Sequence, residues 1–145
     1  RKRLNKNDTK KGYLLDGYPR TIPQAKGLDA FLDKMNKNID AVISIELDDK
    51  LIIKRLSSRR FCNKCGNITN LLFNPSNKDN QCNKCNGLLV QRSDDSKEVI
   101  IERLKIYNKQ TAPLLKYYQE KKLIKKINGN GNINNVKKLI LKALS

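Results

Sequence analysis

The sequence predicts an α/β protein that has a parallel sheet and one small inserted module. Short apolar segments rich in β-branched residues alternate with longer segments of helical periodicity, which is the pattern of strands alternating with helices. Two C-x-x-C pairs lie within residues 61–90 and predict the inserted module. With 145 residues, the chain has the size of one domain and can bury a moderate core.

The first half of the chain predicts two strands and two helices. Residues 12–17 are a short apolar run that ends in an acidic residue and a turn, which predicts a strand. Pro23 opens a helix whose apolar side chains at helical spacing are Ala25, Leu28, Phe31, Leu32 and Met35. Residues 41–47 form the second strand, and Asp48 is the expected N-cap of the next helix. That second helix carries Leu51, Ile53, Arg55, Leu56 and Arg59.

The second half returns to the alternating pattern after the cysteine-bearing segment, which has little helical periodicity. Residues 93–96 precede a long helix, and Pro113 breaks or kinks it. One face of this helix carries Val99, Ile100, Leu104 and Tyr107. Residues 123–127 form the third strand, and an Asn-Gly turn follows it. The last helix has an apolar face made of Ile133, Val136, Leu139, Ile140 and Ala143.

The net charge of +17 suggests a polyanionic partner, such as nucleic acid, an acidic membrane surface or nucleotide phosphates. The lysines are spread along the whole chain, so a solvated surface with a biased composition explains much of this charge equally well. No apolar run reaches the ~18 residues that a membrane span needs, and the first residues lack a signal pattern. We therefore expect an intracellular protein, in the cytoplasm or in an organelle, that binds no membrane. We also expect a monomer that binds no nucleic acid.

The four cysteines have the spacing of a metal site. Cys62 and Cys65 form one C-x-x-C pair, Cys82 and Cys85 form the other, and sixteen residues separate the pairs. Two such turns supply four thiolates in a tetrahedral arrangement, which suits Zn²⁺. Two disulfides are the alternative, but an intracellular chain disfavours them. Because four protein ligands leave no open position, we expect the zinc to be structural.

A candidate phosphate site follows the first predicted strand. Asp16 ends this strand and Arg20 follows four residues later. Ligands gather at the carboxyl ends of strands in open α/β sheets, where an aspartate can hold Mg²⁺ through water and an arginine can grip a phosphate with two hydrogen bonds. The alternative is an ordinary surface turn with an incidental ion pair.

Several arginines stand out in a chain that otherwise prefers lysine: Arg20, Arg55, Arg59, Arg60, Arg92 and Arg103. Arg55 and Arg59 are four residues apart, and we expect them on one helix face that leads into the cysteine module. Arginines on both sides of a small module suggest a lid that closes over polyphosphate, because guanidinium groups match phosphate oxygens. The alternative is a salt-bridged hinge that uses Asp94 and Asp95.

Taken together, these motifs resemble the zinc-containing adenylate kinases from about residue 10 to residue 145. The matching segments, in the family's order, are residues 14–21, 58–66, 73–75, 91–95, 110–115 and 127–129. The resemblance implies a P-loop nucleoside monophosphate kinase core with an inserted zinc lid, and the reaction ATP + AMP = 2 ADP. It also implies three regions: residues 1–60 as core with the end of the AMP-binding region, residues 61–92 as the lid, and residues 93–145 as the rest of the core.

The resemblance also implies roles for individual residues. The AMP site would comprise Gly17, Tyr18, Pro19, Arg20, Gln24, Arg92 and Arg103. The ATP site would comprise Arg55, Arg59, Ile68, Thr69 and Gly131. The residues closest to the chemistry would be Asp16, Arg20, Arg59, Arg92 and Arg103, and Asp94 and Asp95 would orient the arginines. Mg²⁺ would accompany ATP, and ADP would be the product.

Two departures from the family pattern bear on these expectations. The 145 residues contain no G-x-x-x-x-G-K-[ST] loop, which in the family lies on a strand between those represented here by residues 12–16 and 41–47. The chain is therefore either a piece of a longer protein or a truncated relative of the family. These residues alone should then be poorly stable and inactive. In addition, Thr69 and Asn70 stand where the family often has Tyr-His.

Two other functions remain open. A zinc-ribbon nucleic-acid-binding protein would use the same cysteine pairs and the charge of +17. It leaves the segment from Asp16 to Arg20 unexplained, and aromatic residues that could stack on bases make up only 6% of the chain. A catalytically dead relative of adenylate kinase that acts as a binding protein is the other alternative, and the missing phosphate loop favours it.

Overall fold

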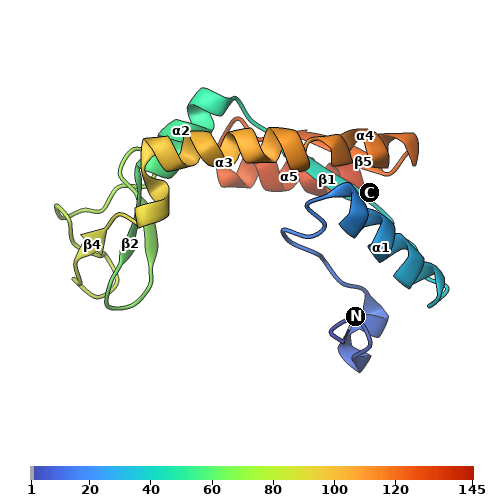
Figure 1. Ribbon diagram of the computed structural model, residues 1–145. Coiled ribbons are helices and arrows are strands. Elements are labelled where there is room, and N and C mark those ends of the chain that lie inside the picture. The colour runs from blue at the N-terminus through green and yellow to red at the C-terminus, as the bar shows by residue number, and fades with distance from the viewer. Residues whose placement is uncertain (1) are drawn as a thin grey trace. The chain divides into compact units, whose positions relative to one another are not determined.

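The computed structural model describes residues 2–145, and the chain divides into two compact units. The first unit comprises the residues up to 45 and residues 107–145, and the second comprises residues 46–106. Figure 1 follows the chain through both units. In the part of the chain that is described, no helix has the length and apolar character to cross a membrane.

The sheet of the first unit consists of β1 (Val42–Glu46) and β5 (Ile124–Asn128). The amide of Val42, which begins β1, donates to the carbonyl of Leu123, directly before β5, at 2.9 Å. Because the two strands begin at the same end of the sheet, they run parallel. The strands predicted at residues 41–47 and 123–127 and the α/β class with a parallel sheet are thus confirmed.

The strand predicted at residues 12–17 is wrong. This segment has no regular structure up to residue 15 and then bends, and Leu14 is 86% exposed. An extended segment becomes a strand only when a neighbour accepts and donates its backbone hydrogen bonds. None of the strand pairs among residues 2–145 includes it.

The helices of the first unit begin where local chemistry predicts. Thr21 is the N-cap of α1 (Ile22–Asp33), with Pro23 in the first turn, and Met35 lies beyond its end. Pro113 opens α4 (Pro113–Glu120), so it separates two helices. Two small apolar clusters pack here, one made of Leu4, Leu28 and Leu32 and the other of Ala25, Leu114 and Tyr118. A 3₁₀ turn, η1 (Asn7–Lys11), lies near the N-terminus.

The last helix, α5 (Ile133–Leu144), begins at the N-cap Asn132, as the turn before it predicts. Its amphipathic pattern is confirmed in part. The helix packs on β5, but none of its side chains is fully buried and Ile133 is 83% exposed.

In the second unit, α2 (Asp49–Ser57) begins at the predicted N-cap, since the carboxylate of Asp48 accepts from two backbone amides. Arg59 does not continue this helix, as predicted, but begins β2 (Arg59–Cys62). The hydroxyl of Ser58 lies 2.6 Å from the carbonyl of Lys54 and closes the last turn. Arg59 then pairs with Asn70 across the adjacent strand.

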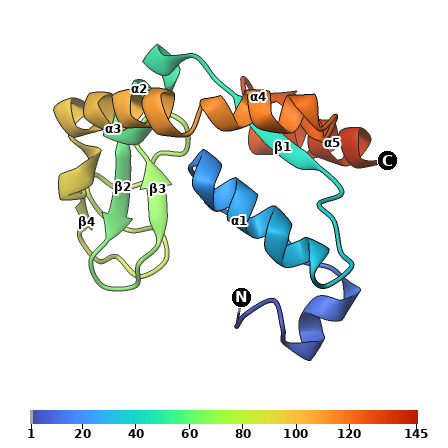
Figure 2. The ribbon, with the colours of Figure 1, turned by 45° about the vertical axis from the view of Figure 1, so that its right-hand side comes forward.

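The cysteine module is a small antiparallel sheet in which β2 lies between β3 (Ile68–Asn70) and β4 (Leu89–Val90) (Figure 2). Its buried cluster consists of Cys62, Cys82 and Leu89. No other apolar side chain among residues 61–92 is buried, so the module has almost no apolar core of its own. A 3₁₀ turn, η2 (Ser93–Asp95), leads from it into α3 (Lys97–Gln110).

Candidate functional site

The four cysteines of the second unit form one cluster. Their sulfur atoms all lie within 4.8 Å of one another, and the shortest separations join Cys62 to Cys85 at 3.5 Å and Cys65 to Cys82 at 3.7 Å. All four are free thiols, with Cys62 and Cys82 buried and Cys65 exposed. Four sulfur donors within this distance fit a tetrahedral zinc site and leave no position for substrate.

Each C-x-x-C pair folds as the same tight turn. The backbone amides of Lys64 and Lys84 donate to the sulfurs of Cys62 and Cys82, each at 3.4 Å. The second turn also needs a glycine, because a Cβ on Gly87 would lie 2.8 Å from the sulfur of Cys62. The local sequence therefore orients the sulfurs within each turn, and the pairing of β2 with β4 brings the two turns together.

The pKa values of Cys82 and Cys85 move in opposite directions because four sulfur atoms lie close together. Burial opposes ionisation of Cys82, but the amides of Lys84 and Cys85 donate to its sulfur and lower its pKa to about 6. At Cys85 the amide of Gly87 favours the thiolate, yet the sulfur of Cys65 and burial outweigh it and raise the pKa to about 12. Four thiolates this close need a shared cation to stay ionised together.

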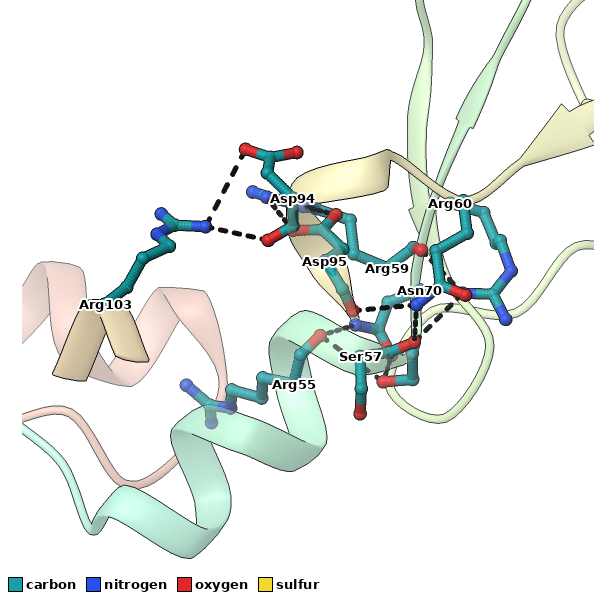
Figure 3. Close-up of polar contacts among 10 residues, drawn as sticks. Arg55, Ser57, Arg59, Arg60, Asn70, Asp94, Asp95 and Arg103 are labelled. Atoms are coloured by element: carbon teal, nitrogen blue, oxygen red, sulfur yellow. Dashed lines mark hydrogen bonds and ion pairs between the residues drawn. The ribbon is translucent and has the colours of Figure 1, made fainter. Parts of the chain in front are cut away.

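A second cluster joins β2 to η2 through an arginine and two aspartates (Figure 3). The guanidinium of Arg59 donates to Asp95 through Nε at 2.8 Å and through a terminal nitrogen at 2.6 Å. The Asp95 side chain is fully buried, and its hydrogen bonds with Arg59 hold the pKa of this carboxyl below its usual range. Arg103 on α3 donates to the carbonyl of Asp94 at 3.2 Å and lies 3.7 Å from its carboxylate.

Two further arginines lie over aromatic rings. The guanidinium of Arg55 is 5.2 Å from the ring centre of Phe73, and that of Arg92 is 5.8 Å from the ring centre of Phe61. At these distances a cation is attracted to the face of the ring. In the second unit, the structure thus gathers Arg59 with Asp95 and Arg103 with Asp94, and it pairs Arg55 and Arg92 with aromatic side chains.

The predicted ATP contacts of β3 differ in their exposure. Ile68 is 58% exposed. Thr69 is buried, and its hydroxyl donates to the carbonyl of Asn74. Of these two side chains, only that of Ile68 is therefore accessible to a ligand. Gly131, in the first unit, lies in the turn before α5 with φ +145°.

In the first unit, Arg20 is held by its own turn. Its Nε donates to the carbonyl of Gly17 at 2.9 Å, and Gly17 has φ +69°. A Cβ on Gly17 would come within 3.0 Å of the guanidinium, so glycine leaves room for this arginine. Thr111, to which the sequence assigned no role, donates its hydroxyl to the carbonyl of Arg20 at 3.0 Å. No local sequence signal links residues 91 positions apart.

The remaining predicted residues lie around the start of α1. The side-chain oxygen of Gln24 accepts from the amide of Arg20 at 2.8 Å, so it links the first turn of α1 to the segment before it. Tyr18 is 44% exposed, its hydroxyl donates to the carbonyl of Gln24, and a cis peptide bond joins it to Pro19. Asp16 is exposed.

Comparison with known proteins agrees with this set of features. The family model for adenylate kinase matches residues 1–123. An adenylate kinase of Methanothrix thermoacetophila is 48% identical over 143 residues, which are 99% of this chain and 66% of the relative. An adenylate kinase of a Geobacillus strain is 46% identical over 94% of this chain and 63% of the relative. One of Methanosarcina mazei is 46% identical over 91% of this chain and 61% of the relative.

The parallel sheet, the four-cysteine cluster and the arginine–aspartate cluster define an α/β protein that carries an inserted module suited to a metal ion. The chain belongs to the adenylate kinase family. It spans between 61% and 66% of the length of these three relatives.

Proposed function

We propose that this chain is the part of an adenylate kinase that carries the arginines and the zinc lid for the reaction ATP + AMP = 2 ADP. The observation that carries the proposal is the arginine–aspartate cluster around Arg59 and Arg103, in a chain 46% to 48% identical to adenylate kinases. Phosphoryl transfer depends on positioning and on charge neutralisation, and guanidinium groups held by aspartates supply both.

In this proposal the first unit supplies the contacts to AMP, and the second unit supplies most of the contacts to ATP. In the first unit, Gly17, Tyr18, Pro19, Arg20 and Gln24 bind AMP, with Arg20 on its phosphate. In the second unit, Arg55 and Arg59 bind ATP, together with the side chain of Ile68 and the backbone of Thr69, while Arg92 and Arg103 contact the transferring group. Asp95 fixes the direction of Arg59, because both of its oxygens accept from that guanidinium. Gly131 contributes backbone near ATP.

Two metals complete the proposal. Cys62, Cys65, Cys82 and Cys85 hold a structural Zn²⁺ that stabilises residues 61–92 as a lid, and the donor set fits this ion. Mg²⁺, when bound with ATP, shields the phosphate charge, and the exposed carboxylate of Asp16 is available to hold it through water. The lid excludes water from the phosphates when it closes.

The test compares turnover in two proteins. Residues 1–145 contain no Gly-rich phosphate loop, so we expect them alone to convert ATP and AMP to ADP no faster than background. A fusion in which they follow the phosphate-loop segment of an adenylate kinase relative should be active. An inactive fusion that still binds both nucleotides would favour a non-catalytic binding protein instead.

The same fusion tests the role of Arg20. Arg20→Lys keeps the charge but loses the planar pair of donors, so kcat should fall by ~10²-fold or more. Arg3→Lys is the matched control, because Arg3 is exposed and pairs with Asp8. An unchanged kcat in Arg20→Lys would contradict a contact between Arg20 and the AMP phosphate and would show that Arg20 is an ordinary turn residue.

A further inference from the structure

Asn70 occupies a central position in the second unit, although nothing in the proposed mechanism uses it. It is the last residue of β3, it pairs with Arg59 across β2, and it is partly buried (Figure 3). Its backbone also exchanges hydrogen bonds with Asn74, at 3.2 Å and 3.0 Å. The backbone of Asn70 is therefore held both by β2 and by Asn74.

The donor end of this carboxamide closes the last turn of α2. Nδ2 of Asn70 donates to the carbonyl of Arg55 at 2.8 Å. The last four carbonyls of a helix have no partner within the helix, so a side-chain donor from another segment fixes the end of the helix. The hydroxyl of Ser58 lies 3.0 Å from Oδ1 of the same carboxamide.

The acceptor end orders the loop after β3. Oδ1 of Asn70 accepts from the amide of Leu72 at 3.0 Å and from the amide of Phe73 at 3.1 Å. An asparagine oxygen that captures the amides two and three residues ahead fixes the loop as a turn. The backbone of Phe73 is placed in this way, and the guanidinium of Arg55 lies 5.2 Å from its ring.

We propose that Asn70 is a positioning residue for the ATP site, because one carboxamide fixes the backbone of Arg55 at one end and the backbone of Phe73 at the other. This inference rests on the proposed function, in which Arg55 contacts ATP. A long arginine side chain costs conformational entropy when a ligand immobilises it. Holding Arg55 against Phe73 before ATP arrives removes part of that cost, so losing Asn70 weakens ATP binding and leaves AMP binding unchanged.

Two variants separate the two ends of the carboxamide. Asn70→Ala removes both the donor and the acceptor. Asn70→Asp keeps an acceptor for Leu72 and Phe73 but places an oxygen opposite the carbonyl of Arg55. The matched control is Asn77→Ala, which removes an exposed asparagine from the same module.

The experiment measures the Kd of Mg²⁺-ATP and of AMP by calorimetry in the whole protein as its gene encodes it. It is accompanied by zinc content and amide hydrogen exchange. In Asn70→Ala, the Kd for ATP should rise about tenfold, while the Kd for AMP and the zinc content stay at wild-type values. The amides of Leu72 and Phe73 should exchange faster in Asn70→Ala and stay protected in Asn70→Asp. Asn70→Asp should weaken ATP binding through Arg55 alone.

Three results would overturn the inference. The Kd for ATP could stay within twofold of wild type in Asn70→Ala, or Asn77→Ala could weaken ATP binding as much. Equal weakening of AMP binding, or loss of zinc, would make Asn70 a general stability residue. A wild-type protein that binds AMP but not ATP would refute the positioning role, and one that binds neither would refute the proposed function with it.

Discussion

The two compact units of this chain are stabilised by different kinds of interaction. The first unit rests on apolar side chains, with Leu32 at 2% exposure in one cluster and Tyr118 at 3% in the other. The second unit has one small cluster, dominated by cysteines, and a buried ion pair between Arg59 and Asp95. The stability that comes from hydrophobic burial falls gradually as apolar atoms are removed. The stability that comes from a metal site or a buried ion pair is largely lost when one ligand or one partner is removed.

The same contrast appears in how each unit treats its buried polar groups. In the second unit, both oxygens of Asp95 accept hydrogen bonds from Arg59. In the first unit, the hydroxyl of Tyr118 has no hydrogen-bond partner within the described residues, and burial raises the pKa of Tyr118 to about 12. The buried carboxylate of the second unit is thus fully hydrogen-bonded, whereas the core of the first unit contains a buried hydroxyl that has no partner among the described residues.

The largest effect should come from removing one metal ligand. Cys82→Ser leaves three thiolates, and structural zinc contributes about 10–16 kcal/mol of apparent binding free energy in small zinc modules. We expect zinc content to fall from one ion per chain and the amides of β2, β3 and β4 to lose protection, while α1 and α4 keep theirs. Elemental analysis and hydrogen exchange measure both. Two disulfides in the purified protein would contradict the zinc assignment.

The next effect should come from the buried ion pair. Asp95→Asn leaves Arg59 without its charged partner and without one of its two acceptors, and breaking a buried ion pair typically costs about 3–5 kcal/mol in the free energy of unfolding. Because Arg59 lowers the pKa of Asp95 below its ordinary value of 3.8, the contribution of the pair is complete above about pH 3.8. It is lost as the pH falls through the lowered pKa.

Denaturant unfolding of wild type and Asp95→Asn at neutral and strongly acidic pH tests this dependence. The two proteins should differ at neutral pH and converge in acid. Asp94→Asn is the control, since its side chain is 54% exposed and its removal should cost less than about 1 kcal/mol. A difference that is the same at every pH would show that the pair does not stabilise the second unit.

A smaller and graded effect should come from the apolar core of the first unit. Leu32→Ala removes a side chain that is 2% exposed and should cost about 2–5 kcal/mol in the free energy of unfolding. Zinc content should not change. Leu14→Ala, at a position 86% exposed, should stay within about 0.5 kcal/mol of wild type. Loss of zinc in Leu32→Ala would mean that the two units do not respond separately.

The smallest effects should come from the helix caps, one in each unit. Thr21→Ala and Asp48→Ala should each cost about 1 kcal/mol in the free energy of unfolding. Asp48 should cost more, because its contact with a backbone amide is 2.8 Å against 3.5 Å for Thr21, and its charge favours the helix N-terminus. Thermal unfolding of the two variants ranks them, and the reverse order would show that cap geometry does not decide the cost.

The sequence by itself determined the features that a few adjacent residues can specify. The N-cap at Asp48 follows from a side chain that bonds to amides within three residues. Pro23 lies in the first turn of α1, and Pro113 separates two helices because it lacks an amide hydrogen. The spacing of the cysteines located the four-sulfur cluster, since each C-x-x-C turn is formed by local amide–sulfur contacts. In these cases the partner is close in the sequence.

Only the tertiary structure decided which distant groups meet. The apolar run at residues 12–17 has strand propensity, but no strand among residues 2–145 pairs with it, so it stays irregular. Arg59 has helical spacing from Arg55, yet it lies in β2 and not in the helix. Its backbone pairs with Asn70, and Asp95, 36 residues away, accepts its side-chain hydrogen bonds. Backbone pairing and buried charge both require a partner, and the identity of a distant partner is set by the fold rather than by the local sequence.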